Sequence, residues 1–186
     1  MELFWNKLQT SWGEMLIIAN AKGIIRITLP NDSVSKVLNG FCKDRDTILT
    51  HRETLLISRA KKQICEFLDG TRTEFHLELS LQGTDFQKKV WNALRKIPYG
   101  NTRCYQDIAK AIGSPKAMRA VGLANNKNPL PIVIPCHRVI GKNGDLVGFG
   151  GGLAMKKKLL KLESKNQINT KQPRSTSTHS IIQASL

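Results

Sequence analysis

The chain has 186 residues, of which 40% are hydrophobic and 23% charged, and its net charge is +15. This length suits one ordinary domain or two small ones, and the apolar content is enough to bury a core. No apolar run approaches the roughly 20 residues of a membrane helix. The opening "MELFWNKLQT" lacks the basic-then-apolar order of a signal peptide. We therefore expect a soluble cytoplasmic protein, associated with the nucleoid if the source is bacterial, with no membrane contact.

The positive charge is concentrated in the second part of the chain. Residues 1–81 carry 11 Lys and Arg against 10 Asp and Glu, whereas residues 82–165 carry 16 against 4. A nearly neutral region beside a strongly basic one predicts that the basic region meets a polyanion such as DNA. The alternative is that these side chains only solvate a surface.

The cysteines do not form a recognisable metal or disulfide pattern. They are Cys42, Cys65, Cys104 and Cys136, and no two of them form a C-x-x-C pair. Without a secretion signal, free thiols are favoured over disulfides. A zinc site would require irregularly spaced ligands, namely Cys42, His51, Cys65 and His76. We therefore expect no bound metal and no cofactor.

Residues 1–81 are expected to form a small α+β domain. The segments "GEMLIIAN" and "GIIRITL" are rich in Ile and Leu and predict two strands joined by a turn near Gly23. Apolar residues at helical spacing predict a helix over 53–68, which ends at Asp69-Gly70. The alternating pattern of "EFHLELS" predicts one further strand.

Residues 82–165 are expected to form a second, mainly helical domain. Thr84 and Gln87 make a capping box that opens a helix reaching to about Ile97. Short helices over 105–112 and 115–124, the second started by Ser114-Pro115, predict a helix-turn-helix. In this basic region the second of them is a candidate DNA-recognition helix. A last helix is expected over 153–162, and the polar residues 166–186 are expected to form a disordered tail.

The segment "IPCHRV" places Cys136 directly before His137 and Arg138. An isolated free cysteine is usually a small buried hydrophobe. The two polar, basic neighbours argue against deep apolar core here, and a positive field lowers a thiol pKa and favours the nucleophilic thiolate. Because neighbouring residues point in different directions, His137 need not touch the sulfur, and a water could connect them.

Three classes of protein could use a reactive thiol. A thiol protease normally draws its Cys and His from distant parts of the chain and does not need a basic helix-turn-helix. A redox-sensing regulator would use both features. A DNA-repair protein would use the thiolate to attack a carbon on a damaged base turned out of the duplex.

A family resemblance separates these alternatives. The segments "FQKKVWNALRKIPYGNTRCYQDIAKAIGSPKAMRAVGLANNKNP" and "PIVIPCHRVIGKNGDLVGFGGGLAMKKKLLKLE" closely resemble the O6-alkylguanine–DNA alkyltransferase (methylated-DNA–protein-cysteine methyltransferase) family over residues 84–163. The resemblance implies a ribonuclease-H-like N-terminal domain and a winged-helix-like C-terminal domain. It also implies transfer of the alkyl group of O6-alkylguanine, and of O4-alkylthymine, to the protein in one irreversible turnover. The implied partner is double-stranded DNA, bound by a monomer through the minor groove.

The resemblance assigns chemical roles to five residues. Cys136 is the alkyl acceptor, His137 the base that acts through a water, and Glu163 the carboxylate that orients this histidine. Asn128 braces the turn that holds the cysteine. Tyr105 lies beside the extruded nucleotide, where its hydroxyl can donate a proton or a hydrogen bond to O6 as guanine leaves.

The resemblance also assigns DNA and pocket residues. Arg119 would fill the gap left by the extruded base, and the small residues of its helix would allow close approach to the groove. The full set of expected DNA contacts is Arg119, Tyr105, Ala120, Gly122 and Arg138, and the expected pocket residues are Val139, Phe149 and Gly150. Phe149 stands where a tyrosine is frequent, Gly150 where Ser or Ala is common, and Cys104 where Ser is usual. The remaining alternatives are a non-catalytic DNA-damage binder, whose members lack the acceptor cysteine, and the redox regulator.

Overall fold

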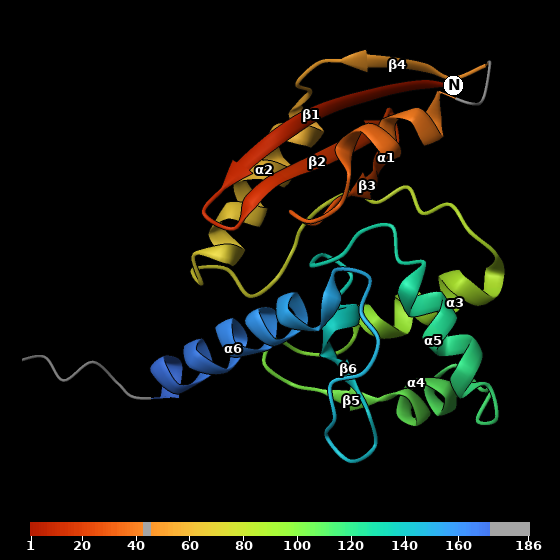
Figure 1. Ribbon diagram of the computed structural model, residues 1–186, viewed down its shortest axis with the longest axis vertical. Coiled ribbons are helices and arrows are strands. Elements are labelled where there is room, and N and C mark those ends of the chain that lie inside the picture. The colour runs from red at the N-terminus through yellow and green to blue at the C-terminus, as the bar shows by residue number, and fades with distance from the viewer. Residues whose placement is uncertain (43–45, 172–186) are drawn as a thin grey trace, which may run out of the picture.

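A computed structural model describes residues 1–42 and 46–171 and has two regions, an N-terminal sheet with two helices and a C-terminal set of helices (Figure 1). The expected α+β class is confirmed. The regions are joined by an extended segment that runs from the end of α2 (Leu55–Leu68) to the start of α3 (Asp85–Arg95). Among the described residues, no helix combines the length and the apolar character needed to span a membrane.

The N-terminal region is built on a four-stranded sheet. Its strands are β1 (Glu2–Thr10), β2 (Gly13–Asn20), β3 (Gly23–Ile27) and β4 (Ile48–His51), in the order β3-β2-β1-β4. β1 to β3 form an antiparallel meander, and β4 pairs with β1 in parallel. The strands predicted at β2 and β3 are confirmed, whereas β1, β4 and the helix α1 (Val34–Phe41) were not anticipated.

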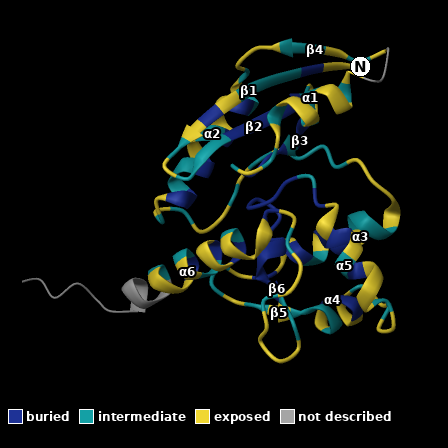
Figure 2. Cartoon of the chain, viewed as in Figure 1, coloured by how far each residue is buried: buried dark blue, intermediate teal, exposed yellow. Residues whose placement is uncertain are grey.

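Each face of this sheet is covered by one helix, because the inner strand β2 is apolar at successive positions. Met15, Ile17 and Ala19 belong to the main core, against which α2 packs Ile57 and Ile64. The opposite face has a smaller core of Leu3, Leu16, Ile18 and Ile25, covered by the apolar side of α1. Figure 2 shows the resulting band of buried residues along β2.

The strand predicted over "EFHLELS" is wrong as a full strand. Residues 74–80 pair with β3 through a single bridge, Ile24 to Leu79, in which the Ile24 amide donates to the Glu78 carbonyl at 2.8 Å. The expected shared face is nevertheless present, since Phe75, Leu77 and Leu79 all pack against the main core. The alternation of apolar and polar residues over 74–80 thus reflects an extended connecting segment that buries one of its faces, and not a strand of the sheet.

The C-terminal region contains α3, α4 (Tyr105–Ala111), α5 (Met118–Asn126) and α6 (Gly152–Lys171), with a two-stranded parallel ladder of β5 (Arg103–Cys104) and β6 (Val139–Ile140). The predicted capping box is confirmed: the Gln87 amide donates to the Thr84 hydroxyl, and the Thr84 amide to the Gln87 side chain. Trp91 of α3 donates its indole N–H to the Ala124 carbonyl of α5 at 2.9 Å, which fixes the helix-turn-helix against α3.

Two helix boundaries differ from the predictions. The second helix of the helix-turn-helix begins at Met118, because Ser114 and Ala117 close a separate turn through a backbone bond of 2.9 Å. The last helix continues to Lys171, so the tail predicted from residue 166 begins inside it. There Asn166 donates to the Gly70 carbonyl and to the Tyr99 hydroxyl at 3.0 and 3.1 Å. The rest of that predicted tail, 172–186, lies outside the described residues.

Edge strand β3 and the loop after it contact the C-terminal region beside Cys136. The Ile27 amide donates to the Pro129 carbonyl at 2.9 Å. The Asn31 side chain donates to the Gly151 carbonyl at 2.8 Å. These two bonds hold the N-terminal region against the segments on either side of the "PCHRV" motif.

Candidate active site

The cysteine is held by a tight turn that Asn128 organises. The Asn128 amide nitrogen donates to the Ile134 carbonyl at 2.8 Å and to the Cys136 sulfur at 3.1 Å, while its oxygen accepts the Leu130 amide at 3.0 Å. Within this turn Ile132 has a φ of 74°, a left-handed conformation that is rare for a β-branched residue. A local strain of this kind persists only where surrounding bonds determine the backbone, and the bonds of Asn128 to the Ile134 carbonyl and the Leu130 amide do so here.

Cys136 lies in deep core, so the expectation that its polar neighbours keep it out of the core is wrong. It opens a short 3-10 turn (Cys136–Arg138) and is 6% exposed, and His137 is fully buried. Burial raises the pKa of the Cys136 thiol to about 11, although the hydrogen bond from Asn128 and the positive charge of Lys156 act in the opposite direction. The resting group is therefore the thiol, and the positive surroundings only limit the rise in pKa.

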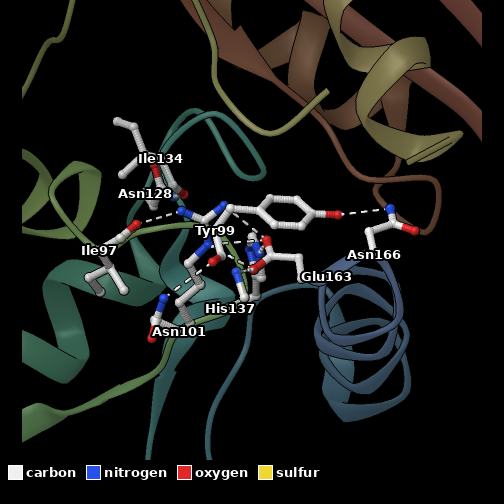
Figure 3. Close-up of polar contacts among 10 residues, drawn as sticks. Ile97, Tyr99, Asn101, Asn128, Ile134, His137, Glu163 and Asn166 are labelled. Atoms are coloured by element: carbon white, nitrogen blue, oxygen red, sulfur yellow. Dashed lines mark hydrogen bonds and ion pairs between the residues drawn. The ribbon is translucent and has the colours of Figure 1, made fainter. Parts of the chain in front are cut away.

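His137 forms a buried pair with Glu163 of α6. Its Nε2 lies 2.7 Å from Glu163 Oε1, and both side chains are 0% exposed (Figure 3). Burial lowers the pKa of His137 and favours the neutral ring. Burial alone would raise the pKa of Glu163, but the hydrogen bond from His137 and the pair with Arg138 outweigh it and lower that pKa. A neutral histidine beside an ionised carboxylate carries its proton on Nε2, which leaves Nδ1 as the basic atom.

Nδ1 of His137 has no hydrogen-bond partner among the described residues although it is buried. A buried polar atom without a partner is unusual and calls for an explanation. No direct hydrogen bond joins His137 to Cys136 in the described part of the chain, as the sequence interpretation had allowed. An unpaired basic nitrogen next in sequence to the thiol is suited to taking up a proton through a bridging water.

Arg138 was expected to contact DNA, but its side chain is buried. Its side chain is 7% exposed and pairs with Glu163. Nε and Nη2 donate to the Glu163 carboxylate at 3.0 to 3.1 Å, and Nη1 donates to the Ile97 carbonyl. The Glu163 carboxylate also accepts the Gly100 amide at 2.8 Å. Arg138 is thus the buried counter-ion that keeps Glu163 charged, and it is not available on the surface.

Lys156 is a buried residue beside the cysteine that sequence reasoning missed. It is fully buried on α6, and its ammonium donates to the carbonyls of Val139 and Val147 at 2.6 and 2.7 Å. These bonds fasten the loop after β6 to α6, and the Lys156 charge also acts on Cys136. The spacing of residues 156, 159 and 163 in the sequence could have indicated that Lys156 shares a helix face with Glu163. All three residues are 0% exposed in the structure.

A cavity of about 310 Å³ opens between α5 and this loop and reaches Cys136. Tyr105 lies in its wall and donates its hydroxyl to the Val147 carbonyl at 3.2 Å. Phe149, expected in the pocket, also lines this cavity, and Gly122 of α5 does too. Gly150 lines a neighbouring cavity that also reaches Cys136, and Val139 contributes the carbonyl that Lys156 binds.

The outer surface of α5 has the small and basic residues expected there. Arg119 and Ala120 are exposed, and Gly122 is half-buried against the Tyr105 ring. Met118 and Leu123 are also exposed, at 44% and 65%. At the start of α4, Cys104 replaces a hydroxyl cap, and Asp107 instead accepts the Cys104 amide at 2.9 Å. No group of three or more His, Cys, Asp or Glu among the described residues is arranged to hold a metal ion.

Comparisons with known proteins agree with this arrangement. Residues 85–165 match the family model described as "6-O-methylguanine DNA methyltransferase, DNA binding domain". The constitutive methylated-DNA–protein-cysteine methyltransferase of Bacillus subtilis is 45% identical over 150 residues, which are 80% of this chain and 87% of that protein. The chain belongs to the methylated-DNA–protein-cysteine methyltransferase family. The resemblance inferred from the sequence is therefore confirmed.

The similarity to this methyltransferase family extends over both regions. A member from Methanosarcina barkeri is 40% identical over 168 residues, covering 88% of this chain and 99% of its own length. The solved structure of Mycobacterium tuberculosis OGT in complex with DNA matches with a TM-score of 0.75 and 37% identity, covering 89% of this chain and 94% of that one.

Proposed function

We propose that this protein repairs DNA by direct reversal, transferring the alkyl group of O6-alkylguanine to Cys136. The observation that carries the proposal is the position of Cys136, buried at the end of a cavity and hydrogen-bonded to Asn128. The next residue, His137, is paired with Glu163. O4-alkylthymine, with its alkyl oxygen in a similar position, is proposed as a second substrate.

The reaction begins with removal of the thiol proton. With its pKa near 11, Cys136 is protonated at neutral pH, so a base is needed at the moment of attack. His137 Nδ1 accepts the proton through a water, and Glu163 stabilises the imidazolium through the bond to Nε2. Arg138 keeps Glu163 ionised and so acts as a positioning residue.

The thiolate then displaces the alkyl group. The sulfur–carbon bond forms as the bond from carbon to O6 breaks, and the electron pair goes to guanine, which takes up one proton. Tyr105, in the cavity wall, is the proposed donor on the guanine side: its hydroxyl turns from the Val147 carbonyl to the base, and the proton held by His137 replaces the one it gives. A thioether is a poor leaving group, so the chemistry gives no route back to the thiol, and each molecule reacts once.

We further propose that α5 enters the minor groove, with Arg119 filling the space of the extruded base and Ala120 and Gly122 allowing close approach. A flipped base then occupies the cavity beside Tyr105. In this proposal residues 1–81 form a ribonuclease-H-like domain and 82–165 a winged-helix-like domain, with β5, β6 and the following loop as the wing. The protein acts as a monomer in the cytoplasm, on the nucleoid in a bacterium.

Gly150 is proposed to widen the range of alkyl groups. Its missing side chain leaves space towards Asn126, whose Oδ1 would lie 3.6 Å from an added Cβ. Gly150→Ser should therefore slow benzyl transfer more than methyl transfer, and an unchanged ratio of the two rates would contradict this role.

The proposed reaction is tested by weighing the intact protein after incubation with duplex DNA that carries one O6-methylguanine. Gain of one methyl group on the Cys136 peptide is expected, and Cys136→Ala should gain none while still binding DNA. Tight binding without a mass change would favour a non-catalytic damage binder. That alternative is disfavoured because the acceptor cysteine is present, and a redox sensor is disfavoured because burial suppresses the thiolate.

A further inference from the structure

The solvent side of α6 carries a row of lysines that has no part in the reaction proposed above. Lys157, Lys161 and Lys165 are exposed and follow one another at intervals of four residues, so they lie on one side of the helix. Lys158 is exposed beside them. Glu163, the acidic residue of α6, lies on the opposite, buried side. These four lysines, called the lysine face here, therefore form a surface of one charge.

The charges of the lysine face are not balanced within the protein. None of its members forms an ion pair in the described part of the chain. On the N-terminal region, by contrast, exposed basic side chains do pair, as Lys7 does with Glu14 at 3.1 Å. Equal charges four residues apart also weaken a helix. A row of positive charge that is unbalanced and costs helix stability indicates an anionic partner.

The helix that carries the lysine face is fixed to the N-terminal region at two points. Near its start, Lys158 Nζ lies 3.8 Å from the centre of the Trp12 ring, in the turn between β1 and β2. Further along, Asn166 donates to the Gly70 carbonyl at 3.0 Å. Four residues of α-helix rise by about 6 Å, so between these points the lysines are presented at regular intervals of that size. The lysine face is therefore held in place by contacts at both of its ends.

Nucleic acid fits the lysine face better than an acidic protein does. Between positions 157 and 165, the exposed residues of α6 are the four lysines and Ser164. Surfaces that bind proteins are depleted in lysine and have aromatic or apolar residues at their centre. Contacts to a phosphate backbone need only positive side chains at intervals along the partner. The composition of the lysine face therefore favours phosphates.

We propose that the lysine face of α6 binds the phosphate backbone of a second segment of double-stranded DNA while α5 holds the first. In Figure 1, α6 runs away from α5, so the two helices present their charges to different places. A protein with two such surfaces passes directly from one segment to another, because the second is captured before the first is released. This inference goes beyond the proposed alkyl transfer and does not depend on it, since both segments can be undamaged.

The test measures how fast the full chain leaves a short, labelled, undamaged duplex while an unlabelled duplex is added at rising concentration. With a single DNA surface the dissociation rate is independent of the competitor, which only traps protein already released. With a second surface the rate should rise in proportion to the competitor. The combined variant Lys157→Gln, Lys161→Gln and Lys165→Gln should lower this proportionality by about tenfold, because three phosphate contacts are lost. Lys158 is kept so that its contact with Trp12 is not disturbed.

The matched control removes the same charge from the other region. Lys22, Lys36 and Lys62 are exposed there, and their combined replacement by Gln should leave the competitor dependence at the wild-type value. A competitor-independent rate in the wild type, or an equal fall in both triple variants, would overturn the proposal. So would release by poly-glutamate as fast as by duplex, which would indicate an acidic protein partner. Absence of methyl transfer would instead refute the proposed function, because this test uses only undamaged DNA.

Discussion

Arg119 and Arg138 come from the same basic region but occupy opposite environments. Arg119 is exposed on α5, whereas Arg138 is buried and donates three hydrogen bonds to Glu163 and one to a backbone carbonyl. The exposed surface of α5 and the buried cluster of His137, Arg138 and Glu163 therefore depend on positive charge for different reasons. On the surface the charge is available to a partner, and in the core it balances the carboxylate that pairs with His137.

The largest effect should come from removing the buried carboxylate. Glu163→Gln leaves Arg138 buried without a counter-ion, which should lower the free energy of unfolding by about 3 kcal/mol or more. Alkyl transfer should slow as well, because His137 loses the anion that stabilises its protonated form. Urea unfolding and single-turnover mass measurements check the two effects.

Glu53→Gln is the matched control for this substitution. Glu53 pairs with Lys61 at 2.6 Å but is 46% exposed, so its loss should change stability by less than about 1 kcal/mol. If both variants are equally stable, the buried cluster does not differ energetically from a surface ion pair.

The pH dependence of the thiol gives the next largest effect. Reaction of Cys136 with iodoacetamide in the native protein should rise about tenfold per pH unit up to about 11, while the urea-unfolded chain should level off near the ordinary value of 9.0. Because the unfolded chain releases the thiol proton first, this group's contribution to stability is present below pH 9 and lost as the pH rises towards 11. A native profile that levels off near pH 9 would contradict the role given to burial.

On the exposed side, if Arg119 has the role proposed for it, Arg119→Ala should slow methyl transfer from duplex DNA by about tenfold, because base extrusion costs a few kcal/mol and the arginine would compensate part of it. Transfer from free O6-benzylguanine, which needs no extrusion, should remain at the wild-type rate. Parallel assays on the two substrates measure this. An equal loss on both would show that Arg119 supports the fold and not extrusion.

The smallest effect is expected from a single exposed lysine. Lys142 lies in the exposed loop after β6, so Lys142→Ala should weaken binding to all DNA sequences alike and reduce the slope of log affinity against log salt by about 1. Titrations at several salt concentrations provide the slope. No change in slope would place Lys142 outside the DNA interface.

The sequence could predict most of the helices and the two Ile-rich strands, because amphipathic spacing and capping are local properties. It could not predict β4, a short strand whose position depends on parallel pairing with β1. The family resemblance carried by "PCHRV" and its surroundings pointed to the chemistry, but the burial of Arg138 and Lys156 depends on α6 passing behind the motif. The placing of Arg26 and Asn125 on one cavity could not be foreseen either, because these two residues come together only when the two regions dock.

The docking of β3 beside the cysteine has an evolutionary consequence. Arg26, Leu29 and Asp32 lie outside residues 85–165, the part of the chain that the family model describes. Substitutions at these three positions can alter the shape and charge of the cavity of about 270 Å³ beside Cys136, while leaving Cys136, His137 and α5 unchanged. Residues outside the matched range can therefore change the surroundings of Cys136 without any change in the residues that hold it.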